Sequence, residues 1–219
     1  MLRDTELQDR IMAELKWEPS VQSSEIGVSV RNAIVTLNGT VNTYAEKFAA
    51  ERAVERVTGV RAIAEDLKVQ LPGRFERSDT DIAKAALSAI EWDVEVPDDR
   101  IRIVVRDGWV TLEGKAAWFY QKAAAERAVR NLAGVVGVTN LIEVEPATKP
   151  GSEDVKAKIR SAMQRSAELD TRKIDVMIDN GTVTLKGTVR SWAEREDAER
   201  AAWSAPGVRS VKDELQLAV

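Results

Sequence analysis

The chain has 219 residues, of which 44% are hydrophobic and 31% are charged, with a formal net charge of −4. These values are typical of a soluble globular protein and argue against a strongly basic nucleic-acid-binding chain. Cysteine and histidine are both absent, which excludes disulfides, thiolate nucleophiles, and the commonest general base and metal ligand. No apolar run approaches the roughly 18 residues of a membrane-spanning helix.

Three sequence patterns recur along the chain in the same order. VTLNGTV, VTLEGKA and VTLKGTV begin at Val35, Val110 and Val183. AAERAV, AAERAV and DAERAA begin at Ala49, Ala124 and Asp197. GVRAIAEDLKV, GVVGVTNLIEV and GVRSVKDELQL begin at Gly59, Gly134 and Gly207. This repetition predicts three copies of one small module, at residues 1–71, 78–145 and 152–219.

Each module is predicted to begin with an amphipathic helix. Its apolar residues recur every four positions and form one stripe: Leu7, Ile11 and Leu15; Ile82, Ala86 and Ile90; Val155, Ile159 and Met163. Residues able to cap a helix stand just upstream: Asp4, Asp79 and Ser152. Trp17 and Trp92 match each other at the end of this helix, and we expect both at the edge of the core.

Two strands are expected next, joined by a tight hairpin. Asp107-Gly108 and Asn180-Gly181 are strong signals for a turn with positive φ, whereas Asn32-Ala33 fits less well because alanine resists positive φ. A glycine recurs within the second strand of each module, where it indicates a bulge or a close backbone approach: Gly39, Gly114 and Gly187.

A second helix and a last strand complete each module. Small residues on the helix, such as Ala50 and Ala53, let it lie close to a sheet, and we expect a terminal glycine at its C′ position: Gly59, Gly134 and Gly207. The element order is therefore αββαβ. The predicted fold class is α+β, with three tandem modules that each have a three-stranded mixed sheet and two helices on one face.

The pattern VTLxGxV, a helix with AERAV and the segment GVxxVxxxLxV resemble the BON domain (bacterial OsmY and nodulation domain), and the resemblance covers nearly the whole chain. It implies an αββαβ fold and a role in binding, often suggested to involve phospholipid. It also implies bacterial origin and a stress association, without a catalytic motif to transfer. Some relatives bind potassium.

Aromatic residues stand at equivalent positions just after the second strand: Tyr44, Phe119 and Trp192. One hypothesis makes them a shared contact edge for lipid or a neighbouring module. The alternative, which we favour from sequence, is a hydrophobic staple packed on the helix that follows.

Two places diverge between the modules. Trp203 has Glu55 and Arg130 as counterparts, and Trp118 has Thr43 and Ser191. Such divergence predicts contacts between modules or chains, so we expect Trp203 and the Trp118-Phe119 pair to be largely buried by another module or subunit. Together with Tyr120 and the aromatic residues after the second strands, they form the candidate interface or lipid set: Trp118, Phe119, Tyr120, Trp203, Tyr44 and Trp192.

These observations predict a non-enzymatic binding or assembly protein, with no catalytic residues, cofactor or metal. The expected partner is another copy of the chain or another protein. Peripheral binding to anionic phospholipid is the alternative, and potassium sensing is a second one. We expect no nucleic-acid partner and no membrane span. The acidic N-terminal sequence predicts a cytoplasmic location as encoded, or a periplasmic one if a leader was removed.

Overall fold

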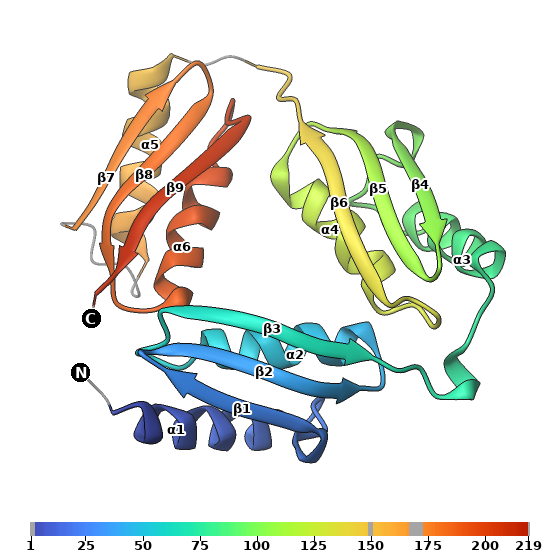
Figure 1. Cartoon of the computed structure of the whole chain (residues 1–219). Coiled ribbons are helices and arrows are strands. Elements are labelled where there is room, and N and C mark those ends of the chain that lie inside the picture. The colour runs from blue at the N-terminus through green and yellow to red at the C-terminus, as the bar shows by residue number, and fades with distance from the viewer. Residues whose placement is uncertain (1–2, 149–150, 167–172, 219) are drawn as a thin grey trace.

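The computed structural model describes residues 3–148, 151–166 and 173–218. Figure 1 shows three modules, each with a three-stranded sheet and two α-helices in the order αββαβ. The α+β class predicted from the repeated patterns is therefore confirmed.

The elements of the modules occupy equivalent positions in the repeats. The first module contains α1 (Asp4–Trp17), β1 (Ile26–Arg31), β2 (Ile34–Val41), α2 (Tyr44–Glu55) and β3 (Ala62–Val69). The second contains α3 (Asp79–Glu91), β4 (Ile101–Arg106), β5 (Trp109–Ala116), α4 (Phe119–Arg130) and β6 (Gly137–Val144). The third contains α5 (Ser152–Arg165), β7 (Ile174–Asp179), β8 (Thr182–Val189), α6 (Trp192–Trp203) and β9 (Ser210–Leu217).

Each sheet is mixed, with the second strand in the middle. β1 pairs antiparallel with β2 through a two-residue turn, and β3 pairs parallel with β2 after the chain crosses through α2. The registers of the other two sheets are equivalent. Because the crossover helix returns the chain to the same sheet, both helices of a module contribute to one core.

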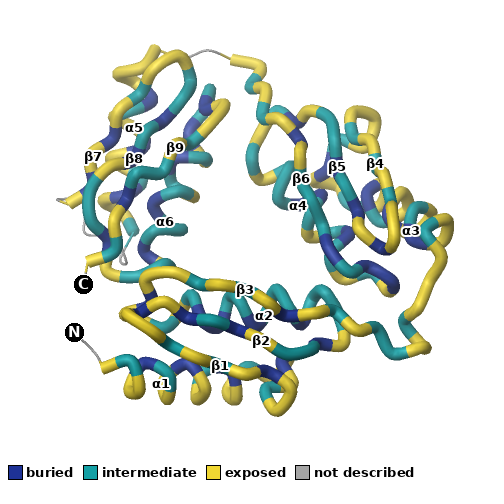
Figure 2. Tube along the Cα trace, in the orientation of Figure 1, coloured by how far each residue is buried: buried dark blue, intermediate teal, exposed yellow. Residues whose placement is uncertain are grey.

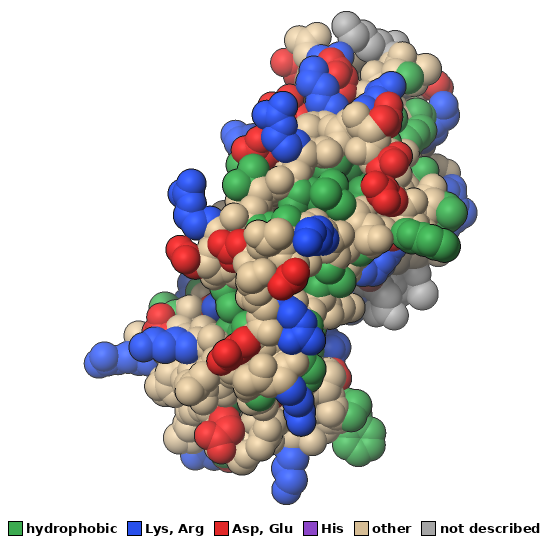
Figure 3. All heavy atoms as spheres, turned by 90° about the vertical axis from the view of Figure 1, so that its right-hand side faces the viewer, with side chains coloured by type: hydrophobic (Ala, Val, Ile, Leu, Met, Phe, Trp, Pro, Cys, Tyr) green, Lys and Arg blue, Asp and Glu red, His purple; other side chains and the backbone are tan. Residues whose placement is uncertain are grey.

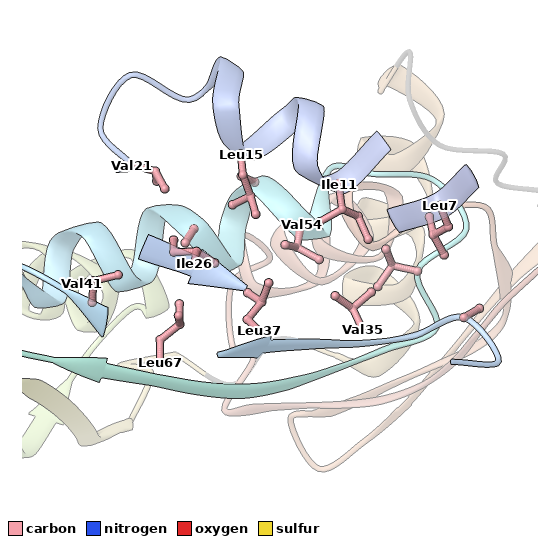
Figure 4. Close-up of a cluster of buried hydrophobic side chains, with 14 residues drawn as sticks. Leu7, Ile11, Leu15, Val21, Ile26, Val35, Leu37, Val41, Val54 and Leu67 are labelled. Carbon is pink, nitrogen blue, oxygen red and sulfur yellow. The ribbon is translucent and has the colours of Figure 1, made fainter. Parts of the chain in front are cut away.

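Each module has its own hydrophobic core, and Figure 4 shows that of the first module. The stripe of Leu7, Ile11 and Leu15 on α1 is at most 1% exposed and packs with Val35 and Leu37 of the sheet. Complete burial of such a side chain contributes roughly 1.5–3 kcal/mol. Figure 2 shows buried positions inside all three modules, which agrees with three separate clusters.

The aspartates before the first helices do not act as N-caps, which corrects the sequence expectation. Asp4 and Asp79 are the first residues of α1 and α3. The Asp4 carboxylate accepts hydrogen bonds from the amides of Asn32 and Ala33 at 2.8 and 3.0 Å, across the module in the hairpin turn. The turn amides compete for this carboxylate because left-handed residues turn consecutive N–H groups in one direction. Ser152 likewise begins α5, and Gly151 is its N-cap.

The hairpin turn of the first module uses left-handed backbone despite its alanine. Asn32 and Ala33 have φ of 52° and 61°. The first turn therefore has the same positive φ values that the sequence predicts for the two turns that contain glycine. Within the second strands, a Cβ on the recurrent glycine would overlap the backbone oxygen that precedes the first strand. This holds for Gly39, Gly114 and Gly187, whose φ values are 122°, 133° and 139°.

The glycines after the second helices have a different place from the one expected. They lie three residues beyond the C-cap residues Arg56, Asn131 and Ser204, in the turn that leads to the last strand. Their φ values are positive, at 103°, 92° and 82° for Gly59, Gly134 and Gly207. The helices end before the left-handed residue is reached.

The modules surround a common centre. Figure 1 shows α2, α4 and α6 nearer to this centre than α1, α3 and α5, with β3, β6 and β9 on the inward side of their sheets. The second helices are therefore the elements through which the modules meet.

Candidate binding site at the junctions between modules

The aromatic residue that begins each second helix reaches a neighbouring module. Tyr44 of α2 packs against the core of the second module, and Trp192 of α6 packs against the core of the first. Phe119 of α4 stacks on Trp203 of the third. The hydrophobic staple favoured from sequence is therefore corrected, because Tyr44 and Trp192 pack against the core of a neighbouring module and Phe119 stacks on a ring of one.

At two of the junctions, the residue near the end of the second helix that contacts a neighbouring ring occupies an equivalent position. At the first–second junction, the guanidinium of Arg130 lies 3.7 Å above the ring centroid of Phe48. At the second–third junction, Trp203 replaces Arg130 and stacks on Phe119, with centroids 4.5 Å apart. Cation–π and offset-stacked contacts are each favourable when partly desolvated.

The third–first junction uses hydrogen bonds and charge. The indole Nε1 of Trp192 donates to the backbone oxygen of Val60 at 3.1 Å. Arg52 of α2 forms ion pairs with Glu196 of α6 and with Glu55 of its own helix. Glu55 is the counterpart of Arg130 and Trp203, and Glu196 is the counterpart of Phe48.

The three junctions are thus equivalent in position and different in chemistry. Each module presents the start of its second helix to the next module and the end of that helix to the previous one, so the contacts are head-to-tail and close into a ring. Because each junction pairs different residue types, exchanging two modules would leave a cation, an aromatic ring or a carboxylate without its partner. The divergence between modules therefore makes each junction chemically distinct.

Sequence reasoning missed four residues of these junctions: Phe48, Arg130, Arg52 and Glu196. For Phe48 and Glu196, the sequence did contain a signal, because the equivalent positions 48, 123 and 196 carry different residue types. Trp203 lies where it was expected to meet another module, although it also packs against the core of its own. Trp118 differs from the expectation, since 38% of its surface is exposed.

Trp118 and Tyr120, which we call the aromatic edge, stand out because Trp118 replaces the capping residue of the second helix. Thr43 and Ser191 cap α2 and α6 by accepting from the amides of Glu46 and Glu194. An indole has only a donor, so Trp118 provides no such acceptor to α4. Losing a Ser or Thr cap typically costs about 1 kcal/mol. A residue that weakens its own helix and stays exposed is suited to an external contact.

A hollow of about 490 Å³ lies beside the aromatic edge at the second–third junction. Trp118, Phe119 and Tyr120 line it from the N-cap and first turn of α4, and Arg200, Trp203 and Ser204 line it from α6 and its C-cap. Tyr120 is 53% exposed. Aromatic walls with an arginine among the lining residues match the composition that favours protein binding.

Trp17 and Trp92 are exposed, which corrects the prediction that they lie at the edge of the core. Trp17 is 82% exposed and Trp92 is 85% exposed, and Val94 near Trp92 is 100% exposed. Each tryptophan stands two positions after the last buried residue of its helix, at the end of that helix. Figure 3 shows hydrophobic side chains among interspersed acidic and basic ones on the side of the molecule that it presents.

One carboxyl on α6 has an unusual proton affinity. Burial, followed by the hydrogen bond and negative charge of Asp213, raises the pKa of Glu199 to about 7. Arg195 forms an ion pair with Asp213 on β9. In the first module, Lys47 and Glu65 form the equivalent pair at 2.7 Å, and burial also raises the pKa of Glu51 there.

The described residues contain neither a carboxylate cluster for a metal ion nor a membrane-spanning helix. In residues 3–148, 151–166 and 173–218, no group of three or more Asp and Glu side chains is placed to hold a metal ion. None of the described helices is both long enough and apolar enough to cross a membrane.

Comparison with known structures gives distant similarities. The structural protein CdsD of the type III secretion system of Chlamydia trachomatis is 13% identical, and the match covers 96% of this chain and 91% of that chain with a TM-score of 0.27. Its C-terminal domain is also 13% identical, with full coverage of both chains and a TM-score of 0.28.

Comparison with known sequences is more informative. Osmotically-inducible protein Y of Escherichia coli (strain K12) is 28% identical over 160 residues, which cover 69% of this chain and 78% of that protein. The model of the BON domain matches residues 3–70, 78–146 and 152–219. The αββαβ modules, their shared glycines and these three matches together show that the chain belongs to the BON domain family and contains its domain three times.

Proposed function

We propose that this protein is a non-enzymatic binding and assembly protein, in which three BON modules form a ring that presents the aromatic edge of Trp118 and Tyr120 to another protein or a second copy. The observation that carries the proposal is the loss of the α4 cap in favour of an exposed indole. The hollow beside it has a volume of about 490 Å³ and offers a concave surface to a partner. The absence of histidine and cysteine is consistent with binding rather than chemistry.

A stress-associated role is part of the proposal. It rests on the relative described as osmotically inducible. Abundance of this protein after an increase in external osmolarity, followed by immunoblotting, tests that part independently of binding.

The binding role is tested with a variant that restores the residues of the sister modules. Trp118→Thr with Tyr120→Ala reproduces Thr43 and Ala45 of the first module. The mass of the protein is measured by size-exclusion chromatography with light scattering, and chemical crosslinking in cells identifies its contacts. We expect the double variant to stay folded and to lose self-association or its crosslinked protein partners.

The matched control is Trp109→Thr, which removes a tryptophan that is 47% exposed on the sheet of the same module. Its third-module counterpart is Thr182. This variant should keep the contacts of the unmodified chain. If Trp118 and Tyr120 can be replaced without changing mass or crosslinks, the aromatic edge is not the binding surface.

Peripheral binding to anionic phospholipid is the second candidate, and the exposure of Trp17 and Trp92 favours it. Exposed indoles suit the interface between lipid headgroups and acyl chains. Flotation with vesicles of phosphatidylglycerol and phosphatidylcholine tests it, with Trp17→Gln and Trp92→Gln as the variant. Lipid binding that depends on these residues, and not on Trp118 and Tyr120, would support this second candidate over the first.

A further inference from the structure

The hairpin turn of the first two modules holds a carboxylate. The amides of Asn32 and Ala33 donate to Asp4 at 2.8 and 3.0 Å. The amides of Asp107 and Gly108 donate to Asp79, both at 2.9 Å. In both cases, the two turn residues have positive φ and direct their N–H groups at the two oxygens of one carboxylate.

The third module keeps the turn and lacks the carboxylate. Asn180 and Gly181 have φ of 47° and 81°, as in the sister turns. The residue equivalent to Asp4 and Asp79 is Ser152, whose side chain is shorter and uncharged. In the part of the chain that the structure describes, neither turn amide donates to a side-chain oxygen or to a backbone oxygen outside the strands.

A hollow of about 220 Å³ lies at this turn, with Ser152, Asn180 and Gly181 among its lining residues. A second residue difference helps to explain its volume. Val155 lines it, whereas the larger Leu7 and Ile82 occupy that position in the sister modules. In the second module, a Cβ on Gly134 would meet the Ile82 side chain at 2.8 Å, which shows how fully isoleucine occupies this space.

The hollow combines donors with an apolar wall. Ile178 and Val208 line it together with Val155. Arg209 is held beside the turn because its amide donates to the oxygen of Gly181 at 2.8 Å, and its side chain lines the hollow. The two convergent amides of the turn favour an anion, and the aliphatic wall favours a short hydrocarbon group.

We propose that this hollow binds a small carboxylate that carries a short aliphatic group. Its oxygens accept from the amides of Asn180 and Gly181, as Asp4 and Asp79 do in the sister turns, and the hydroxyl of Ser152 supplies a further donor. The aliphatic group packs on Val155, Ile178 and Val208. A free branched-chain acid and the C-terminus of a peptide ending in valine or leucine present this same chemistry. The site is separate from the aromatic edge.

The amides themselves report on binding. Uniformly ¹⁵N-labelled full-length protein is titrated with sodium isovalerate, sodium acetate, N-acetylvaline and sodium phosphate, with sodium chloride holding the ionic strength constant. We expect the resonances of Asn180 and Gly181 to shift in a saturable manner, with isovalerate or N-acetylvaline binding more tightly than acetate. Tighter binding of isovalerate identifies a free acid as the ligand type, and tighter binding of N-acetylvaline identifies a peptide terminus.

Ser152→Asp gives the third module the carboxylate that Asp4 and Asp79 supply in the other two. Its Asn180 and Gly181 resonances should already be shifted, and its affinity for isovalerate should fall by at least about tenfold, because a charge-assisted hydrogen bond is worth about that factor. Val155→Leu keeps Ser152 and fills the apolar part, so it should weaken isovalerate more than acetate. This second variant decides the matter if the first does not fold.

The reciprocal control transfers the site. Asp79→Ser with Ile82→Val gives the second module both differences, and the amides of Asp107 and Gly108 should then respond to isovalerate. The proposal is overturned if Asn180 and Gly181 of the unmodified chain do not respond, if Ser152→Asp binds isovalerate as tightly, or if phosphate binds more tightly than every carboxylate.

Discussion

The indole of Trp203 lies nearly parallel to the phenyl ring of Phe119, with planes inclined by 13°. This contact joins the end of α6 to the start of α4. Trp203 takes the position that Arg130 has in the second module, whereas Phe119 takes the position of Tyr44 and lies one helical turn before the equivalent of Phe48. An aromatic pair of this kind contributes about 0.5–1.5 kcal/mol beyond its buried area.

Trp203→Glu should loosen the second–third junction, because it introduces a carboxylate against the face of Phe119. We expect a loss of about 1–3 kcal/mol and a melting temperature lower by several degrees. Trp203→Arg is the matched control, since Arg130 shows that a guanidinium is compatible with a ring at this place. Equal losses in both variants would show that only the packing of Trp203 in its own module matters.

The contact between Arg130 and Phe48 is expected to couple the first two modules by about 0.5–2 kcal/mol. A double-mutant cycle with Arg130→Gln and Phe48→Leu measures this energy by urea denaturation. Leucine keeps an apolar side chain while removing the ring, so packing changes little. Strictly additive effects of the two substitutions would show that the cation–π contact contributes nothing.

Separate modules should be less stable than the whole chain. A unit of this size buries only about 60% of its unfolded surface, and separation exposes Tyr44, Phe119 and Trp192. Residues 1–72, 76–146 and 150–219 are expressed individually and melted, alone and as an equimolar mixture. We expect lower melting temperatures for the fragments and partial recovery in the mixture. Fragments that each melt as high as the whole chain would refute the interdependence.

Glu199 should make the protein less stable as the pH rises. Its pKa is about 7 in the folded state against an ordinary value of 4.5, so the folded state binds the proton more tightly. Protonation of Glu199 therefore favours the folded state. This contribution to the unfolding free energy is fully present below pH 4.5 and is lost as the pH rises through about 7. Glu199→Gln should raise the unfolding free energy at pH 8 by about 1 kcal/mol, a value reduced for solvent screening. The advantage should vanish at pH 4.5, and an equal advantage at both pH values would contradict this account.

Ala33→Gly should stabilise the first module, because a left-handed residue with a Cβ carries a cost of roughly 1–2 kcal/mol that glycine avoids. Part of this gain is offset because Ala33 is only 7% exposed. Gly108→Ala is the opposite substitution, and its Cβ would lie 2.7 Å from the backbone oxygen of Gly134. Thermal melts should show a gain for the first variant and a loss for the second; the reverse order would contradict the role assigned to the turn.

Local sequence determined the modules and their elements. The stripe of Leu7, Ile11 and Leu15 has the period of a helix, and Asn180-Gly181 has the backbone preferences of a hairpin, so both follow from interactions within a few residues. The order of the elements followed from the repetition, because the same patterns occur in the same order in all three modules. The divergence at Trp203 also marked a contact position in advance.

Tertiary structure decided which surfaces meet. Alignment of the modules shows that residues 55, 130 and 203 differ, but it contains no distance between them and residues 48, 123 and 196 of a neighbouring module. The Asp4 carboxylate was equally able to cap its own helix or to bind a turn 28 residues later, and only the packing of α1 on the sheet settles that competition. Trp17 and Trp92 follow an apolar stripe in sequence yet lie beyond the sheet that covers it, so their exposure depends on where the core ends.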